Sequence, residues 1–295
     1  MGLFFSSDRF TRPGPGVRPD APRKKGIARL AEIMGRDMWN FFRAGFLAFL
    51  GCLPFIIGMF FAVDTHALLF MLLAGIIGGL IAGPELSAMA DTVLRSLRDE
   101  PGYWWETYRR VWKRNARESL VPGMLTGLVL SMQIFTLFHM SVISAGIVTW
   151  VLLILSFVIT LGLESYIWPQ IALLDLPLYG ILKNSLLLFL GYLPRSLGAI
   201  AIKAVYWGAI LLFFPLTTII LPFTNFWLPM LPALLCIYQP LNKCFTIEST
   251  INKMREDELN AALAKDNEPL PEEPAAEAEE TSEEPASDDF SSDAQ

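Results

Sequence analysis

Long stretches without a charged residue dominate the middle of the chain. Four stretches lack Asp, Glu, Lys and Arg: 20 residues after Arg43, 18 after His66, 45 after Glu118 and 39 after Lys203. A helix crosses the hydrocarbon core of a bilayer with about 20 apolar residues, and lipid offers no hydrogen-bond partner to an irregular backbone. The first two stretches each fit one crossing. The other two are about twice as long and carry turn signals near the middle, HMSVISAG and LPFTNF.

This pattern predicts an all-α, polytopic helical membrane protein with a membrane domain over residues 44–241. Six membrane-spanning helices are expected, at about 44–63, 67–83, 121–140, 145–164, 197–216 and 223–241. Interfacial amphipathic helices are expected at about 103–118 and 178–193. Outside the membrane domain we expect a cytoplasmic basic segment at 1–43, a cytoplasmic helix at 242–265 and a disordered acidic tail at 266–295.

The segment RDEPGYWWETYRRVWKRNARESL, residues 98–120, combines aromatic and cationic side chains. The aromatic residues recur at helical spacing, and the cations lie mostly on the other side of that helix. Indole rings favour the headgroup boundary, and cations favour anionic lipid, which predicts contact with the inner leaflet. Docking of another protein is the alternative, whereas nucleic acid is not expected because the rings would have to leave the membrane to stack on bases. The candidate contact residues are Trp104, Trp105, Trp112, Arg109 and Arg114.

The segment LYGILKNSLLLFLGYL, residues 178–193, is apolar enough to suggest a seventh crossing. An additional crossing would reverse the side on which every later residue lies, and would place Lys243 and the acidic tail outside the cell. We therefore expect an interfacial or re-entrant helix.

Composition and charge agree with this topology. Of the 295 residues, 53% are hydrophobic and 18% charged, which is too apolar for a water-facing surface of that size. Cytoplasmic loops carry an excess of Lys and Arg, so the side on which the cations fall predicts the orientation. Nine cations lie in residues 1–43, seven in 84–120, two in 165–196 and four after residue 241. All these regions lie on one side of the predicted spans, which places both termini in the cytoplasm.

The last 30 residues differ from the rest of the chain. Residues 266–295 hold twelve carboxylates and no cation, together with many Pro, Ala and Ser residues. Such a composition cannot bury enough apolar surface to fold. We expect a solvated appendage, or one that folds back on the basic inner face through its charge.

Three ionisable residues fall at the same end of the predicted spans: Glu85, Glu164 and Lys203. Ionisable groups at membrane depth are costly, and they often serve function. We expect either that each reaches interfacial water or that they form a polar site open to the cytoplasm, with Lys203 as counter-ion to one carboxylate.

No pattern of residues indicates an enzyme. His66 and His139 lie at the outer ends of predicted spans without ligand or triad spacing, and the three cysteines lack metal-site spacing. Phosphate-binding glycine loops are missing, so no cofactor, metal or enzymatic activity is expected. The glycines of AGIIGGLIAG, at positions 75, 79 and 83, are expected to serve close helix packing.

Several motifs resemble those of the YesL-like family of bacterial membrane proteins. They are RPGPGVRPDAPRKKG, the GCLP of the first predicted span, AGPELSAMADTVLRSLRDEPGYWWETYRRVWKRNARESL and LKNSLLLFLGYLPRSL. The resemblance covers about residues 1–255 and implies a bacterial inner membrane and gene association with carbohydrate-uptake systems of the binding-protein type. No functional residues are established for that family, and the long acidic tail departs from it. The expected function is an accessory or regulatory component of carbohydrate uptake, in contact with permease subunits; the alternative is a small-solute transporter.

Overall fold

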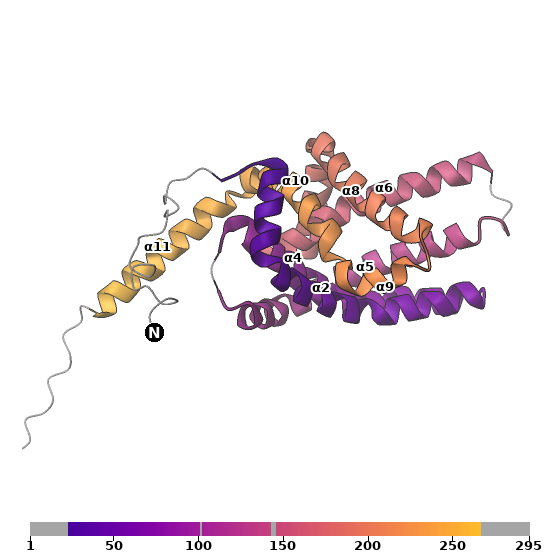
Figure 1. The fold of residues 1–295 in the computed structure, drawn as a ribbon, viewed down its shortest axis with the longest axis horizontal. Coiled ribbons are helices and arrows are strands. Elements are labelled where there is room, and N and C mark those ends of the chain that lie inside the picture. Colours follow the sequence, from indigo (N-terminus) through magenta and orange to yellow (C-terminus); the bar gives the residue numbers. More distant parts are fainter. Residues whose placement is uncertain (1–22, 101, 143–145, 267–295) are drawn as a thin grey trace, which may run out of the picture. The chain divides into compact units, whose positions relative to one another are not determined.

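The computed structural model describes residues 23–100, 102–142 and 146–266, and all regular structure in these ranges is helical. The elements are α2 (Gly26–Asp64), α3 (Leu68–Leu73), the π-helical turn η1 (Ala74–Gly78), α4 (Gly79–Arg98), α5 (Trp104–Phe138), α6 (Ile147–Leu173), α7 (Leu178–Gly191), α8 (Leu193–Leu212), α9 (Thr217–Thr224), α10 (Trp227–Phe245) and α11 (Ile247–Asp266). Helices α5 and α6 and the later part of α2 run lengthwise through the bundle, whereas the first turns of α2 run across it (Figure 1). The chain is an all-α, polytopic helical membrane protein, as predicted.

Five helical segments are long and apolar enough to cross a membrane: Gly26–Asp64, Leu68–Arg98, Trp104–Phe138, Ile147–Leu173 and Leu193–Leu212. The sixth predicted span, 223–241, falls on α9 and α10 instead. Helix α10 has 19 residues, but its last turns carry Gln239, Asn242 and Lys243, which lower its hydropathy. Five helices in the described part of the chain thus meet the length and composition of a span, and a sixth crossing by α10 stays a prediction.

Helices α2 and α5 extend well beyond the uncharged stretches. Helix α2 has 39 residues and begins at Gly26, inside the segment expected to precede the membrane domain. At 1.5 Å per residue it is about 58 Å long, nearly twice the hydrocarbon thickness. Helix α5 unites the two elements expected at 103–118 and 121–140, with Pro122 inside it. The break that we expected between residues 118 and 121 is not present. Extending a formed helix costs little, and one proline removes only one main-chain hydrogen bond.

Glycines bring α5 into backbone contact with α4 and η1. A Cβ atom built on Gly127 would lie 2.5 Å from the Gly75 carbonyl oxygen and 2.8 Å from the Gly79 Cα atom. One built on Gly123 would lie 2.9 Å from the Gly83 Cα atom. No side chain fits between these backbones. The packing role expected for glycines 75, 79 and 83 is confirmed.

Helices α6, α7, α8 and α10 complete the bundle, and α8 packs mainly on α10. The predicted helix at 178–193 appears as α7, and Tyr192 separates it from α8. Its 14 residues extend about 21 Å, too short to cross a bilayer of about 30 Å. Its depth in the membrane stays a prediction.

The helix expected at 242–265 appears as α11 and begins at Ile247. Thr246 adopts a left-handed conformation, φ 48°, which ends α10 at Phe245. Residues 249–295 form a unit separate from residues 1–248. The predicted acidic tail lies, apart from Asp266, outside the described residues.

Candidate functional site

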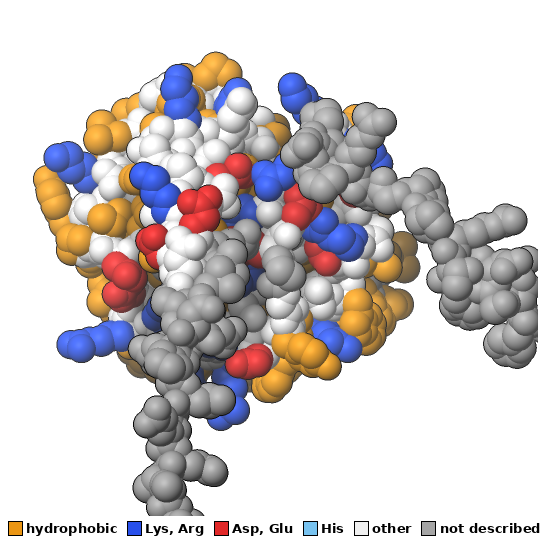
Figure 2. All heavy atoms as spheres, turned by 90° about the vertical axis from the view of Figure 1, so that its left-hand side faces the viewer, with side chains coloured by type: hydrophobic (Ala, Val, Ile, Leu, Met, Phe, Trp, Pro, Cys, Tyr) orange, Lys and Arg blue, Asp and Glu red, His pale blue; other side chains and the backbone are white. Residues whose placement is uncertain are grey.

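One end of the bundle gathers most of the charged side chains. We call it the charged end: the region where α2 begins, α4 ends and α5 begins. Figure 2 shows this face, with Lys and Arg mixed with Asp and Glu over its centre and hydrophobic side chains around its rim. This distribution suits a surface that meets water at its centre and lipid at its edge.

Asp99 is the centre of an ion-pair cluster at the charged end. It follows the last residue of α4 in a left-handed conformation, φ 58°. Its carboxylate accepts the guanidinium of Arg29 at 2.7 Å and that of Arg23 at 3.0 Å, and Arg36 pairs with its other oxygen. Three arginines from the start of α2 and the residues before it thus meet one carboxylate.

The same guanidinium groups also cap the C-terminus of α4. The carbonyl oxygens at a helix end lack main-chain partners, and cations stabilise them. Arg36 donates to the Ser96 carbonyl at 2.8 Å, Arg29 to that of Leu97 at 3.1 Å and Arg23 to that of Arg98 at 3.1 Å. This network fixes the beginning of α2 against the end of α4.

The arginines determine the charge state of Asp99. Partial burial alone would raise the pKa of its carboxyl, but hydrogen bonds from Arg36 and Arg29 outweigh burial and lower that pKa. The cluster therefore stays ionised at neutral pH, and Glu248, Glu32 and Asp37 give the three arginines further counter-ions.

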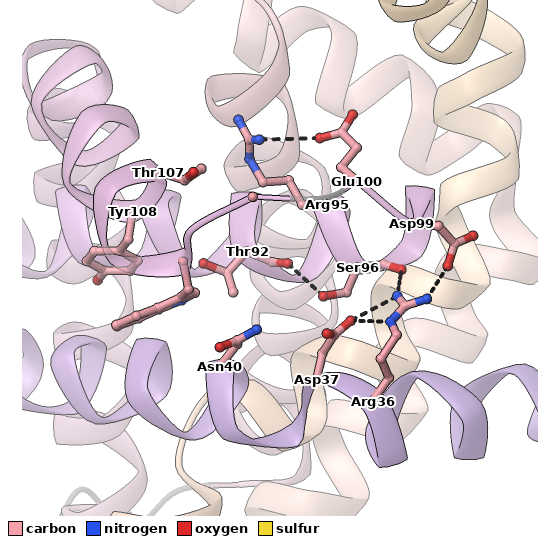
Figure 3. A pocket seen from close by; sticks show the side chains of 12 residues that line it. Arg36, Asp37, Asn40, Thr92, Arg95, Ser96, Asp99, Glu100, Thr107 and Tyr108 are labelled. Carbon is pink, nitrogen blue, oxygen red and sulfur yellow. Dashed lines mark hydrogen bonds and ion pairs between the residues drawn. The ribbon is translucent and has the colours of Figure 1, made fainter. Parts of the chain in front are cut away.

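A cavity of about 270 Å³ opens beside this cluster. In Figure 3, Thr107 and Tyr108 of α5 lie on one side and Arg36 and Asp99 on the other, with Asn40 of α2 and Thr92 of α4 between them. The lining residues are Arg36, Asp37, Asn40, Thr92, Arg95, Ser96, Asp99, Glu100, Gly102, Trp104, Thr107 and Tyr108. We call this cavity the charged-end pocket. Its volume approaches the lower limit of small-molecule sites, about 300 Å³.

The wall of the charged-end pocket formed by α5 is aromatic and has an unused donor. The rings of Trp104 and Tyr108 are tilted against each other, with centroids 5.3 Å apart. The Trp104 indole nitrogen is buried and has no hydrogen-bond partner in the described part of the chain. Buried donors normally find an acceptor. The pocket thus offers a flat apolar wall to a side chain or a small molecule, and the unpaired indole N–H is buried within the protein.

Glu85 lies behind this wall. Tyr108 donates its hydroxyl to one Glu85 oxygen at 2.5 Å, and the Trp112 indole N–H donates to the other at 2.9 Å. A Cβ atom on Gly51 of α2 would lie 2.6 Å from Glu85 Cγ, so the side chain fills the space that this glycine leaves. The aromatic segment that we expected to contact lipid thus also binds a carboxylate inside the protein.

Glu164 and Lys203 form a separate pair. Lys203 Nζ of α8 lies 4.0 Å from a Glu164 oxygen of α6, and the lysine is only 7% exposed. The cavity beside them holds about 10 Å³, room for a single water molecule at most. Of the three residues expected to form one polar site, the structure pairs two, as counter-ions, and gives Glu85 hydrogen-bond partners on α5.

The other predicted contact residues have different surroundings. Trp105 and Arg109 are exposed, and Trp112 is partly exposed. Trp104 faces the charged-end pocket, and Arg114 donates to the Ala172 carbonyl of α6 at 2.8 Å. Part of the Arg114 guanidinium is thus used within the bundle, although the residue is exposed, and its contact with lipid or a partner stays a prediction.

Two features were not predicted. The arginines that meet Asp99 could have been found, because Arg29 and Arg36 are seven residues apart and so lie on one face of a helix. The pairing of His66 with His139, whose ring nitrogens are 2.7 Å apart, had no local signal. In the described ranges, no three His, Cys, Asp or Glu side chains gather as a metal site.

No family model, curated protein or solved structure matches this chain.

Proposed function

We propose that this protein is an accessory or regulatory component of a bacterial carbohydrate-uptake system. In this proposal it spans the cytoplasmic membrane, with the charged end and both termini in the cytoplasm. The concentration of Lys and Arg on one side of the predicted spans supports the orientation. The resemblance of several motifs to those of the YesL-like family supports the link to carbohydrate uptake.

One observation carries the choice of an accessory role over transport. A carrier needs a solute-sized cavity among its spans, and the cavity beside Lys203 and Glu164 holds about 10 Å³. The glycine contact between α4 and α5 leaves no room for a solute there either. The larger cavity, about 270 Å³, opens at the charged end, where a cytoplasmic partner would bind.

The side chains around the charged-end pocket suit a protein contact. Tyr103 is 86% exposed and Trp105 55% exposed, and both are neighbours of the pocket residue Trp104. Tyr, Trp and Arg contribute most of the binding energy at protein interfaces. We propose that a transporter subunit covers these rings and places one side chain in the pocket.

The experiment is purification from native membranes in mild detergent at endogenous expression, followed by quantitative mass spectrometry. We expect transporter subunits in near-stoichiometric amounts with the wild-type protein. The double variant Tyr103→Ala/Trp105→Ala should lose at least about tenfold of this recovery, as for two interface anchors. The control is Ile147→Ala/Val148→Ala, two exposed residues at the start of α6. Recovery of the protein alone, intact and monodisperse, would refute the proposal.

The alternative, a small-solute transporter, is favoured by the buried pair of Lys203 and Glu164. Solute uptake by proteoliposomes that contain only this protein tests it. Uptake that is lost in Lys203→Met/Glu164→Gln, which leaves no unpaired charge, but retained in a variant of an exposed lysine, Lys183→Met, would favour the carrier. Proteoliposomes that take up no sugar would favour the accessory role.

A further inference from the structure

Arg43 occupies the border between the charged end and the uncharged stretch of α2. It is the last cation before 20 residues without any charge. Long cationic side chains at such a border extend their charge to the headgroup region. Its position along the chain therefore corresponds to the level of lipid phosphate groups.

Two indole rings hold the Arg43 guanidinium. Its central carbon lies 5.1 Å from the centroid of the Trp39 ring and 5.7 Å from that of the Trp104 ring. Both distances are within the range of cation–π contacts. Trp39 lies one helical turn earlier on α2, and Trp104 begins α5. Two separate elements thus fix the position of one charge before any ligand binds.

This arginine differs from the others of the charged end. Arginines 23, 29, 36, 95 and 98 each pair with a carboxylate. Within the described residues, Arg43 has neither an ion pair nor a hydrogen bond, so its N–H groups are available. A positioned guanidinium with free donors is suited to bidentate binding of phosphate.

A row of aromatic rings continues from this position along α2. Trp39 stacks on Phe42 with centroids 5.3 Å apart, and Phe42 stacks on Phe46 at 6.2 Å and on Phe223 of α9 at 5.9 Å. Trp39 is 59% exposed, and Phe46 is also exposed. The row extends into the uncharged stretch, and it offers an apolar track beside the cation.

We propose that Arg43, held between Trp39 and Trp104, binds the phosphate of an anionic phospholipid whose acyl chain lies along Phe42 and Phe46. The cation selects an anionic headgroup, and the aromatic row selects a lipid over a soluble phosphate. The carboxylate of a partner protein would satisfy the cation but would leave the aromatic row uncovered. The site goes beyond the proposed function and needs no transporter.

The test measures lipid retention by the full-length protein in mixed micelles of detergent, phosphatidylglycerol and phosphatidylethanolamine. Native mass spectrometry counts each lipid that stays bound. We expect Arg43→Gln to lower phosphatidylglycerol retention about tenfold, the size expected for one lost charge-assisted contact, and Arg43→Lys to lower it less. Phosphatidylethanolamine retention should change little.

The matched control is Arg110→Gln, which removes the same charge from a 74% exposed side chain that pairs with Glu106. It should retain phosphatidylglycerol as the wild type does. Equal retention by Arg43→Gln and wild type, or an equal loss in both variants, would overturn the proposal. Displacement of the lipid by soluble glycerol phosphate would identify a free-phosphate site instead. Should Arg43→Gln fail to fold, Trp39→Leu provides the second variant, with loss expected and wild-type retention refuting the site.

Discussion

The glycine contact between α4 and α5 permits a quantitative prediction for Gly127→Ala. The added Cβ atom would lie 2.5 Å from the Gly75 carbonyl oxygen, whereas ordinary contact begins at 3.4 Å. The two backbones must therefore separate by about 0.9 Å, because no flexible side chain can move away. Forcing extra atoms into a packed interior costs about 1–3 kcal/mol. The gain in helix propensity, about 0.5–1 kcal/mol, offsets only part of this cost.

The matched control is Gly208→Ala in α8. A Cβ atom there meets nothing within 4 Å, so the same chemical change has only the favourable propensity term. The assay is reversible unfolding in mixed detergent and SDS, followed by circular dichroism, for both variants and the wild type. We expect Gly127→Ala to unfold about 1–2 kcal/mol more easily than wild type and Gly208→Ala to be at least as stable. If Gly127→Ala is as stable as Gly208→Ala, the backbone contact does not exist.

Three further predictions concern the charged groups. Asp99→Asn should lower the free energy of unfolding by about 1–3 kcal/mol at pH 7. Because the pKa of Asp99 is lowered in the folded protein, its contribution to stability is complete above about pH 4 and is lost below it. Thermal melts of the wild type and the variant should therefore converge in acid. Lys203→Met should destabilise by about 3–5 kcal/mol, and adding Glu164→Gln should recover most of it, since the carboxylate, whose side chain is 16% exposed, is then neutral; a double variant as unstable as the single would contradict the pair. Tyr108→Phe should cost about 1–3 kcal/mol because it removes a buried donor to Glu85, as thermal melts in detergent would show.

Much of the fold could be predicted because the bilayer imposes simple rules. Uncharged stretches of about 20 residues located α2, α4, α5, α6 and α8, and glycines at a spacing of four indicated the α4–α5 contact. The ends of helices were predicted less well. Hydropathy reports only the part of a helix in hydrocarbon, so it missed the turns of α2 that precede the uncharged stretch, and it separated the helix at 103–118 from the span that continues it in α5.

The candidate site was predicted only in part. Two alternatives were open for Glu85, Glu164 and Lys203, and the 4.0 Å between Lys203 and Glu164 fits the one in which Lys203 is counter-ion to one carboxylate. Glu85 does not share that pair, because hydrogen bonds from Tyr108 and Trp112 satisfy its carboxylate. Which side chains bind Glu85 depends on how α5 is placed against α4, and residue spacing does not encode that placement. The charged-end pocket likewise arises from three elements whose packing no single motif reveals.

The central claim is that the charged end receives a transporter subunit in the cytoplasm. The most direct measurement places a photoreactive amino acid at position 103 in living cells, irradiates them and identifies the crosslinked products by mass spectrometry. Position 148, exposed near the start of α6, is the control. The account predicts a transporter subunit crosslinked from position 103 and not from position 148. Crosslinks to extracytoplasmic proteins from position 103, or to no protein at all, would contradict it.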